Sequence, residues 1–156
     1  MYYSFIMLKP DALNQELVEP IMQYLKKGNI EIERLGYKKV SEELLCQHYA
    51  EVIAKYGPEF QQKLMKYFHQ KFVIPMVVRS ESSDIISVVR SIVGATNPIE
   101  AAAGTIRGDL CDDSFEKCAK ENRSCENLIH ASDSPETVKR EISIWFGKDI
   151  ADYYCK

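Results

Sequence analysis

The hydrophobic and polar positions of the chain follow first a strand-like and then a helix-like pattern. Residues 3–9 form an almost continuous apolar run, which is typical of a strand covered on both faces. Residues 17–25 carry an apolar stripe at helical spacing, and Gly28 provides the stop after it. Residues 30–40 begin with alternating apolar and charged positions, which predicts a strand with one wet face. The chain therefore begins with a strand, a helix and a second strand.

The middle of the chain predicts a pair of helices followed by a third strand. Ser41 is placed to cap a helix that continues past Tyr49, and Pro58 opens a second helix, so the two are expected to form a hairpin. Residues 72–79 have the composition of a strand. Because Pro75 lacks a backbone donor, we expect this strand to lie near the edge of the sheet or to contain a bulge.

The last part of the chain combines regular elements with a long irregular segment. An apolar stripe predicts a helix over residues 85–93. Residues 95–126 lack clear periodicity, and so long a segment in a compact domain is usually functional or disordered. Residues 128–129 resemble the end of a buried strand, and the serine and proline at 134–135 are typical of a helix start. This order suits one α+β domain over residues 1–156.

Composition and charge narrow the class of protein. The 156 residues are 46% hydrophobic and 28% charged, as in a soluble globular domain with a full core. The net charge of -3 argues against a dedicated nucleic-acid surface. No apolar run approaches the length of a membrane span, and the N-terminus lacks the pattern of a signal peptide. The five cysteines are an odd number, which favours free thiols in a reducing, cytoplasmic location over a disulfide framework.

His130 is the first candidate for chemistry, because it lies between the last apolar strand and the helix that follows. Glu141 falls inside the apolar stripe of that helix, so its carboxylate is expected to face inward and to need a partner. A carboxylate bound to one imidazole nitrogen leaves the other nitrogen free to attack. The alternative is an ordinary hydrogen-bonded His130 and a Glu141 on the surface, and this stretch alone leaves both readings open.

Three cationic side chains are candidates for holding a phosphate. Lys9 lies at a strand end, where we expect its ammonium to stay wet, Arg90 lies on the polar side of a helix, and Arg107 lies in the irregular segment. The chain has no glycine-rich phosphate loop, so a phosphate site would have to be built from side chains. Taken singly, each of the three is typical of a solvated surface charge.

Several other side chains that could take part in binding or catalysis are interpreted as structural. Tyr49 and Phe60 are helical aromatics typical of core packing. His48 and His69 have helical positions and no obvious partner. A zinc site on the cysteines near residues 111–125 is an alternative of another class, but the spacing lacks the close pair that structural zinc usually has.

With these residues in hand, the sequence resembles the nucleoside diphosphate kinase family over essentially the whole chain. The motifs that carry the resemblance are FIMLKPD at 5–11, GATNP at 94–98, GTIRGD at 104–109 and NLIHASDS at 127–134. The resemblance implies a ferredoxin-like α/β sandwich with a four-stranded antiparallel sheet. It also implies a homo-oligomer, with a hexamer favoured and a tetramer or dimer possible.

The resemblance further implies an activity and a set of roles. The activity is transfer of the γ-phosphate of a nucleoside triphosphate, typically ATP, to a nucleoside diphosphate, by a ping-pong reaction through a phosphohistidine at His130. Mg²⁺ is the implied cofactor, and the implied substrates are ribo- and deoxyribonucleotides with broad base tolerance. Glu141 would orient His130, and Asp133 would help to hold Mg²⁺ through water. The implied nucleotide contacts are Lys9, Tyr49, Phe60 (stacked on the base), Arg90, Thr96, Arg107 and Asn127, and Ser132 would line the site. Lys9 is also implied to be a catalytic residue.

The chain departs from the usual family pattern in three places. Ala131 stands where glycine is commoner, the loop between Tyr49 and Phe60 is longer, and so is the segment at about 110–126. We expect the charged residues 112–126 to contribute to the surface and to subunit contacts rather than to the chemistry. The alternative function is a nucleotide-binding or scaffolding protein that has kept the fold and lost turnover, and the intact His130 weighs against it.

Overall fold

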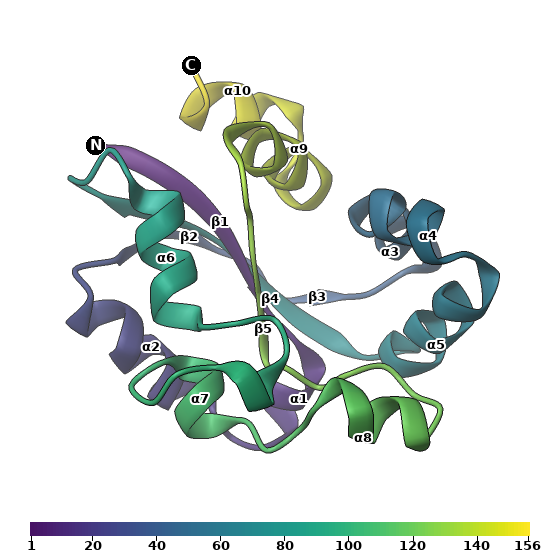
Figure 1. The fold of residues 1–156 in the computed structure, drawn as a ribbon. Helices are drawn as coiled ribbons and strands as arrows, with labels where there is room; N and C mark the ends of the chain where they lie inside the picture. The colour runs from purple at the N-terminus through teal and green to yellow at the C-terminus, as the bar shows by residue number, and fades with distance from the viewer.

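One antiparallel sheet runs through the middle of the molecule, and helices cover both of its faces (Figure 1). The computed structural model describes residues 1–156. The strands are β1 (Tyr2–Leu8), β2 (Glu31–Leu35), β3 (Lys38–Lys39), β4 (Phe72–Ser80) and β5 (Ile129–Ala131). The helices are α1 (Pro10–Asn14), α2 (Val18–Lys27), α3 (Glu42–His48), α4 (Ala50–Tyr56), α5 (Pro58–Phe68), α6 (Ile85–Val93), the 3-10 helix η1 (Pro98–Glu100), α7 (Ile106–Leu110), α8 (Phe115–Lys120), α9 (Pro135–Phe146) and α10 (Lys148–Tyr154).

The expected two-sided burial of the first strand is confirmed. Successive side chains of β1 point to opposite faces of the sheet. Ile6 and Leu8 therefore join the core under α2 and α6, whereas Phe5 and Met7 join the core under α3, α5 and α9. All four are at most 1% exposed. The unbroken apolar run in the sequence thus reflects a strand between two cores.

The strand order is β2-β4-β1-β5, with β3 pairing with β4 beyond the end of β2, and every pairing is antiparallel. The antiparallel sheet and the ferredoxin-like α+β class are confirmed. Of the two positions expected for Pro75, an edge strand is wrong, because β4 lies in the interior of the sheet, but an irregularity in the pairing is present: β2 pairs β4 as far as Met76 and β3 resumes the pairing at Val73. Pro75 is tolerated there because it faces the break between β2 and β3, where its carbonyl accepts from Gly36 N at 2.9 Å and no donor is required.

Two further expectations about the elements need correction. Pro10 ends β1 as expected, but it also opens the short helix α1, for which Lys9 is the N-cap residue. The single helix expected to continue past Tyr49 is two helices, α3 and α4, because the chain leaves helical geometry at Tyr49. Both corrections concern residues close to the site described below.

The segment at 95–126 is less irregular than its sequence indicates. It contains η1, α7 and α8, and it is followed by β5. Thr105 caps α7 by accepting from Gly108 N at 3.0 Å, and Ser114 caps α8 by accepting from Lys117 N at 3.1 Å. These helices have five and six residues, too few to produce a recognisable periodicity.

The expected start of the last long helix is confirmed. Ser134 is the N-cap of α9, its hydroxyl accepts from Thr137 N at 3.1 Å, and the Thr137 hydroxyl accepts from Ser134 N at 3.0 Å. The cap fixes where α9 begins relative to β5. None of the helices combines the length and the apolar character that a membrane crossing requires.

Candidate active site

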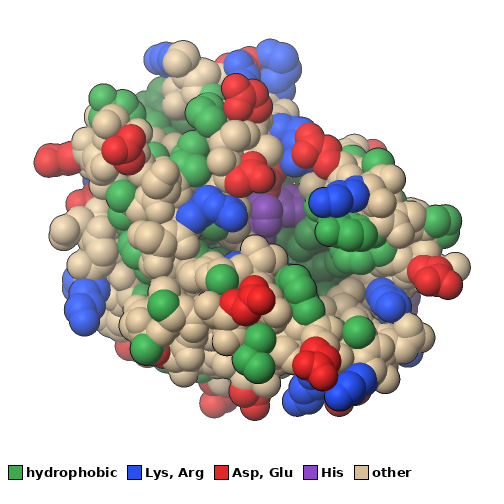
Figure 2. Space-filling model, in the orientation of Figure 1, with side chains coloured by type: hydrophobic (Ala, Val, Ile, Leu, Met, Phe, Trp, Pro, Cys, Tyr) green, Lys and Arg blue, Asp and Glu red, His purple; other side chains and the backbone are tan.

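His130 lies in the middle of β5, opposite Met7 of β1. Its side chain is 26% exposed, so one part of the ring is covered and another part reaches solvent. Figure 2 shows histidine at the floor of a hollow on this face, with Lys or Arg side chains on either side and hydrophobic side chains toward α3–α5. A partly exposed imidazole between cations is suited to meeting an anionic ligand.

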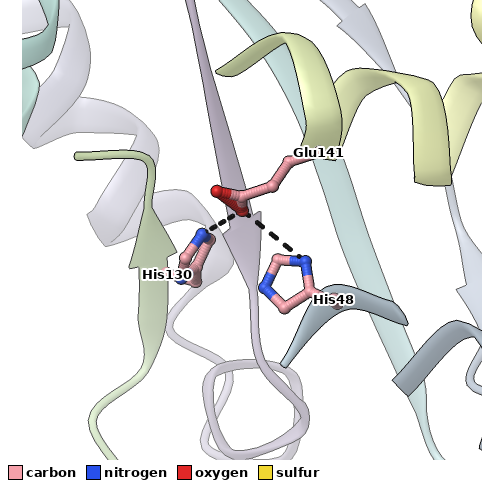
Figure 3. A group of neighbouring side chains, drawn as sticks. All are labelled: His48, His130 and Glu141. Atoms are coloured by element: carbon pink, nitrogen blue, oxygen red, sulfur yellow. Dashed lines mark hydrogen bonds and ion pairs between the residues drawn. The ribbon is translucent and has the colours of Figure 1, made fainter. Parts of the chain in front are cut away.

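The contact expected between Glu141 and His130 is present (Figure 3). Glu141 is 1% exposed and projects from α9, and its Oε2 is hydrogen-bonded to His130 Nε2. The Ser132 hydroxyl donates to the other carboxylate oxygen at 3.1 Å. Glu141 is therefore held by two polar side chains, and its bond to Nε2 fixes the orientation of the His130 ring.

The surroundings of His130 favour the neutral imidazole. Burial, followed by the nearby charges of Lys9 and Arg107, lowers the pKa of His130 to about 3. Burial also raises the pKa of Glu141. His130 Nδ1 has no hydrogen-bond partner in the protein, whereas Nε2 is bonded to the carboxylate. A neutral ring with Nε2 occupied leaves the lone pair of Nδ1 available for attack.

Lys9 is buried, and the expectation that its ammonium stays wet is wrong. The residue is 8% exposed, and it is the N-cap residue of α1. Its Nζ donates to Asn127 Oδ1 at 2.8 Å, and Asn127 Nδ2 donates to the Thr96 carbonyl at 3.0 Å. Burial lowers the pKa of Lys9. The predicted residues Lys9, Thr96 and Asn127 thus form one connected group.

Arg107 holds the backbone on both sides of the site. The residue is 7% exposed, and it donates to the carbonyls of Asn127 and Gly94, both at 3.1 Å, and to that of Ile129. Burial and then the charge of Arg90 lower the pKa of Arg107 to about 10. A guanidinium has five N–H donors, so two remain for an anion after these three bonds. Arg107 therefore combines a structural task with a positive charge near His130.

The other predicted residues, Arg90, Tyr49 and Phe60, bond to or pack against residues other than His130. Arg90 is exposed and donates to the Ala131 carbonyl at 3.1 Å, beside His130 in the chain. Tyr49 lies at the break between α3 and α4, and its ring centroid is 4.7 Å from that of His48. Phe60 is half-buried in α5 and packs beside Tyr56 with ring centroids 5.4 Å apart. No contact joins Phe60 to His130.

Asp133 is the residue expected to help hold Mg²⁺. It is exposed, and its Oδ1 accepts from the Thr137 hydroxyl at 2.9 Å, which leaves Oδ2 without a protein partner. Mg²⁺ prefers oxygen ligands and keeps several of its waters. A single exposed carboxylate oxygen near the hollow fits a contact through such a water, and it does not form a closed metal cage.

Sequence reasoning missed Asp11, which is 2% exposed. Its Oδ2 accepts from Leu128 N at 2.8 Å, and the Tyr67 hydroxyl donates to its Oδ1. Leu128 has a φ of +72°, a left-handed conformation that is unfavourable for leucine. The Asp11 carboxylate therefore stabilises a strained turn between Asn127 and His130. The sequence feature that could have indicated Asp11 is its place in the motif FIMLKPD at 5–11, the first of the motifs that resemble the family.

His48 is the second residue that was missed, because it was interpreted as structural. Its ring centroid lies 4.4 Å from that of His130, and the two rings are nearly perpendicular. His48, His130 and Glu141 form one group of potential metal ligands. Glu141 is already bonded to His130 and Ser132, and the cations Lys9 and Arg107 surround the group, so it is poorly suited to a metal ion.

The cysteine-rich segment supports the loop that carries Asn127. Asp113 is 7% exposed, pairs with Arg123 Nη1 at 2.7 Å, and accepts from Glu126 N at 2.8 Å. Asp113, Cys118 and Cys125 are close enough to hold a metal ion, but the Arg123 cation already neutralises the carboxylate. The contacts of Asp113 therefore do not favour a zinc site at these residues.

Comparisons with known proteins give a consistent result. The sequence model described as "Nucleoside diphosphate kinase" matches residues 3–150. A relative from Methanobrevibacter smithii is 37% identical, and the match covers 96% of this chain and 91% of that protein. A relative from Streptococcus pneumoniae is 36% identical, with coverage of 94% and 100%. Both relatives carry the name nucleoside diphosphate kinase.

Solved structures agree with the sequence matches. A Borrelia burgdorferi nucleoside-diphosphate kinase, described as a transition state mimic with bound vanadate and ADP, superposes with a TM-score of 0.86 at 29% identity, covering 95% of this chain and 88% of that one. An NDP kinase from Pyrobaculum aerophilum superposes with a TM-score of 0.82 at 31% identity, with coverage of 96% and 98%. The similarity therefore extends over nearly the whole of each chain.

Proposed function

The chain belongs to the nucleoside diphosphate kinase family of phosphotransferases, and from that premise we propose that His130 carries the phosphoryl group between two nucleotides. The observation that carries this proposal is the ring of His130, whose Nε2 is bonded to Glu141 while Nδ1 has no protein partner. A neutral imidazole fixed in this way is a competent nucleophile.

In the proposed first half-reaction, Nδ1 of His130 attacks the γ-phosphorus of a nucleoside triphosphate. A P–N bond forms, the bond from the γ-phosphorus to the β-phosphate oxygen breaks, and a nucleoside diphosphate leaves. Glu141 stabilises the positive charge that develops on the ring, because its carboxylate accepts a hydrogen bond from the Nε2–H of His130. A second nucleoside diphosphate then attacks the phosphohistidine through a β-phosphate oxygen and regenerates His130, which gives ping-pong kinetics.

The cations around His130 support the transfer of a charged group. Lys9, Arg90 and Arg107 are the positive charges that act on the His130 ring. Fixed positive charge near the transferring phosphoryl group stabilises its transition state. Mg²⁺, when bound with the nucleotide near Asp133, would neutralise further phosphate charge. Because the proposed contacts are mainly with phosphate and ribose, we propose broad base tolerance for ribo- and deoxyribonucleotides, with ATP the typical donor.

We also propose a single domain over residues 1–156, a cytoplasmic location and a homo-oligomeric assembly, with a hexamer favoured. The five cysteines are free thiols, a state that a reducing compartment maintains. The support for assembly is exposed apolar surface: Ile99 is 74% exposed and Phe115 is 47% exposed.

The experiment that tests the function is incubation with a γ-labelled nucleoside triphosphate, followed by measurement of protein-bound label. We expect stoichiometric label that is lost in acid and retained in alkali, as a P–N bond requires. His130→Ala should abolish the label, and His69→Ala is the matched control, because His69 is an exposed histidine at the end of α5. Label that persists in His130→Ala would place the nucleophile elsewhere. A wild-type protein that binds nucleotide without labelling would favour the binding or scaffolding alternative.

A further inference from the structure

The ring of His48 packs directly against the proposed nucleophile. His48 is the last residue of α3 and is 4% exposed. Its ring centroid lies 4.4 Å from that of His130, and the planes of the two rings make an angle of 78° (Figure 3). The edge of one imidazole therefore meets the face of the other, and rotation of the His130 ring would collide with His48.

A hydrogen bond from Trp145 determines which nitrogen of His48 carries a proton. Trp145 Nε1 donates to His48 Nδ1 at 3.0 Å, and an indole N–H can only donate. His48 Nδ1 therefore presents its lone pair, and the proton of the neutral ring lies on Nε2. Burial, and then the neighbouring His130, lower the pKa of His48 well below its usual value, so the neutral ring is the relevant form.

The tautomer also explains the contact between His48 and Glu141. His48 Nδ1 lies 3.5 Å from Glu141 Oε2, but both atoms present lone pairs when Trp145 supplies the proton. The contact is therefore not an ion pair at neutral pH. His48 covers the carboxylate from solvent, and Glu141 keeps its hydrogen bond to His130.

The other nitrogen of His48 is a buried donor without a conventional acceptor. His48 Nε2 is inaccessible to solvent and has no hydrogen-bond partner. In Figure 3, this nitrogen lies on the side of the His48 ring that faces His130. An N–H directed at the face of an aromatic ring makes a weak but favourable interaction, which offsets part of the cost of leaving the donor unpaired.

We propose that His48 is a positioning residue for phosphoryl transfer. Its Nε2–H edge, in the tautomer set by Trp145, holds the plane of the His130 ring so that Nδ1 faces the hollow while Nε2 stays on Glu141. The proposal rests on the proposed function, because it requires His130 to be the nucleophile. A positive N–H edge against the ring face also favours a neutral His130 over a protonated one.

The proposal predicts a specific kinetic pattern. His48 acts through His130 and is not assigned to the nucleotide, so its loss should lower the rate of phosphorylation and leave nucleotide affinity unchanged. His48→Asn keeps an acceptor near the position of Nδ1 for Trp145 but cannot reach His130. His48→Gln is longer and can present an N–H near the position of Nε2. If His48 only fills space, the N–H of His48→Gln should not restore the phosphorylation rate that His48→Asn loses.

The experiment measures single-turnover phosphorylation of His130 by a γ-labelled nucleoside triphosphate, with ADP affinity and melting temperature recorded for each variant. We expect His48→Asn to slow phosphorylation on the order of tenfold, since misplacing a reacting group by a fraction of an ångström has effects of that scale or larger. We expect His48→Gln to recover most of the rate, and both variants to bind ADP within about twofold of the wild type.

A spectroscopic measurement tests the tautomer without relying on activity. The ¹⁵N chemical shifts of the ring nitrogens in the wild-type protein should identify His48 as the neutral Nε2–H form. In Trp145→Phe the indole donor is lost, so the His48 signals should shift toward a mixture of tautomers. This variant also replaces His48→Asn as the kinetic test if the latter does not fold, and its phosphorylation rate should then fall.

The outcomes separate this proposal from the proposed function. Wild-type protein that forms no phosphohistidine overturns both. Wild-type phosphorylation together with an unchanged rate in His48→Asn overturns the role of His48 alone, and so does an Nδ1–H tautomer in the wild type. A loss of rate that follows the loss of folded protein in both His48→Asn and His48→Gln would reduce His48 to a packing residue.

Discussion

His130 is kept neutral by its surroundings, and this has a consequence for stability that can be measured. Its pKa is lowered to about 3 in the folded protein, whereas an unfolded histidine titrates near 6.5. Below about pH 6.5, His130 binds a proton in the unfolded chain but not in the folded chain. The free energy of unfolding therefore falls as the pH falls toward the folded pKa. At pH 5 this difference is at most about 2 kcal/mol.

The prediction is that His130→Gln loses less stability than the wild type between pH 7 and pH 5. Urea denaturation of both proteins at the two pH values measures the difference. His69→Gln is the control, because it makes the same replacement at an exposed histidine at the end of α5. An identical pH dependence in His130→Gln and wild type would contradict the lowered pKa.

Arg107 gives a second prediction for a single residue. Arg107→Ala should slow phosphorylation about tenfold to a hundredfold, the scale of losing a hydrogen bond to a charged group. It should also lower the melting temperature, because it leaves the carbonyls of Asn127, Gly94 and Ile129 without their donor. Arg90→Ala is the matched control: Arg90 is exposed and bonds one carbonyl, so activity should fall with little change in stability.

The phosphorylation loss in Arg107→Ala should be the same for uracil and guanine nucleotides, because the proposed contact is with phosphate. Single-turnover measurements with UTP and GTP test this. A loss confined to one base would contradict the assignment of Arg107 to phosphate, whatever happens to the melting temperature.

Residue patterns predicted the contact between Glu141 and His130 but missed the contacts of two neighbouring residues, His48 and Asp11. The Glu141 contact could be predicted, because helical periodicity places that carboxylate on the inward face of α9. The contacts of His48 and Asp11 could not, because they join segments far apart in the chain: Trp145 to His48, and Leu128 to Asp11. Periodicity describes one element at a time and contains no information about which elements meet.

Among the helices, the residues that mark a helix end were predicted correctly, whereas the shortest helices were not predicted at all. The N-cap at Ser134 and the stop at Gly28, which is the C-cap of α2, were predicted because each uses a residue type that is favoured at a helix end. The short helices α1, α7 and α8 were not predicted, since five or six residues cannot show a helical period. Lys9 was misplaced for the same reason, because it is the N-cap residue of α1.

Helix α8 and the turn after it depend on one carboxylate, which gives a prediction for this element. Burial alone would raise the pKa of Asp113, but hydrogen bonds from Arg123, Glu126 N and Ser114 N together lower it well below its usual range. Asp113→Asn should therefore destabilise the protein by roughly 2 kcal/mol at neutral pH. It should also leave Asn127 less firmly positioned, because Asn127 follows Glu126, whose N–H is bonded to Asp113.

The sign of the pH effect follows from the lowered pKa of Asp113. Its stabilisation is present above the unfolded pKa of about 4 and is lost as the pH falls further, so the difference between wild type and Asp113→Asn should shrink in acid. Urea denaturation at pH 7 and pH 3 measures it. Asp112→Asn is the control, because Asp112 is exposed. A constant difference at both pH values would show that Asp113 acts without its charge.

For the molecule as a whole, the sheet separates two cores and places the site at their junction. β1 contributes side chains to both cores, and β5 pairs with β1 at His130. A wide groove lies between the N-terminal end of β1 and the helices α9 and α10, but none of the predicted site residues lines it. The proposed site residues therefore belong to the hollow over β5 and not to this groove.

The lengthened segment provides an outer surface next to the site. The Phe115 N–H donates to Asn97 Oδ1 at 3.1 Å, so the start of α8 is attached to the loop that continues into η1. Ile99 of η1 and Phe115 of α8 are 74% and 47% exposed, and the hydrogen bond from Phe115 N to Asn97 links the two segments that carry them. We expect these two side chains to be covered by a neighbouring copy of the chain.

The resulting prediction is that Ile99→Asp combined with Phe115→Glu reduces the molecular mass in solution without removing phosphorylation of His130. Buried charges without partners disfavour an interface, whereas the contacts of His130, Lys9 and Arg107 lie within one chain. Sedimentation and single-turnover phosphorylation, measured on the same samples, test both parts. Tyr153→Glu is the matched control, because Tyr153 is 62% exposed in α10, and its replacement should leave assembly intact. If the double variant keeps its assembly, Ile99 and Phe115 do not form the subunit contact. If it loses phosphorylation while it remains assembled and folded, these two residues serve the site instead.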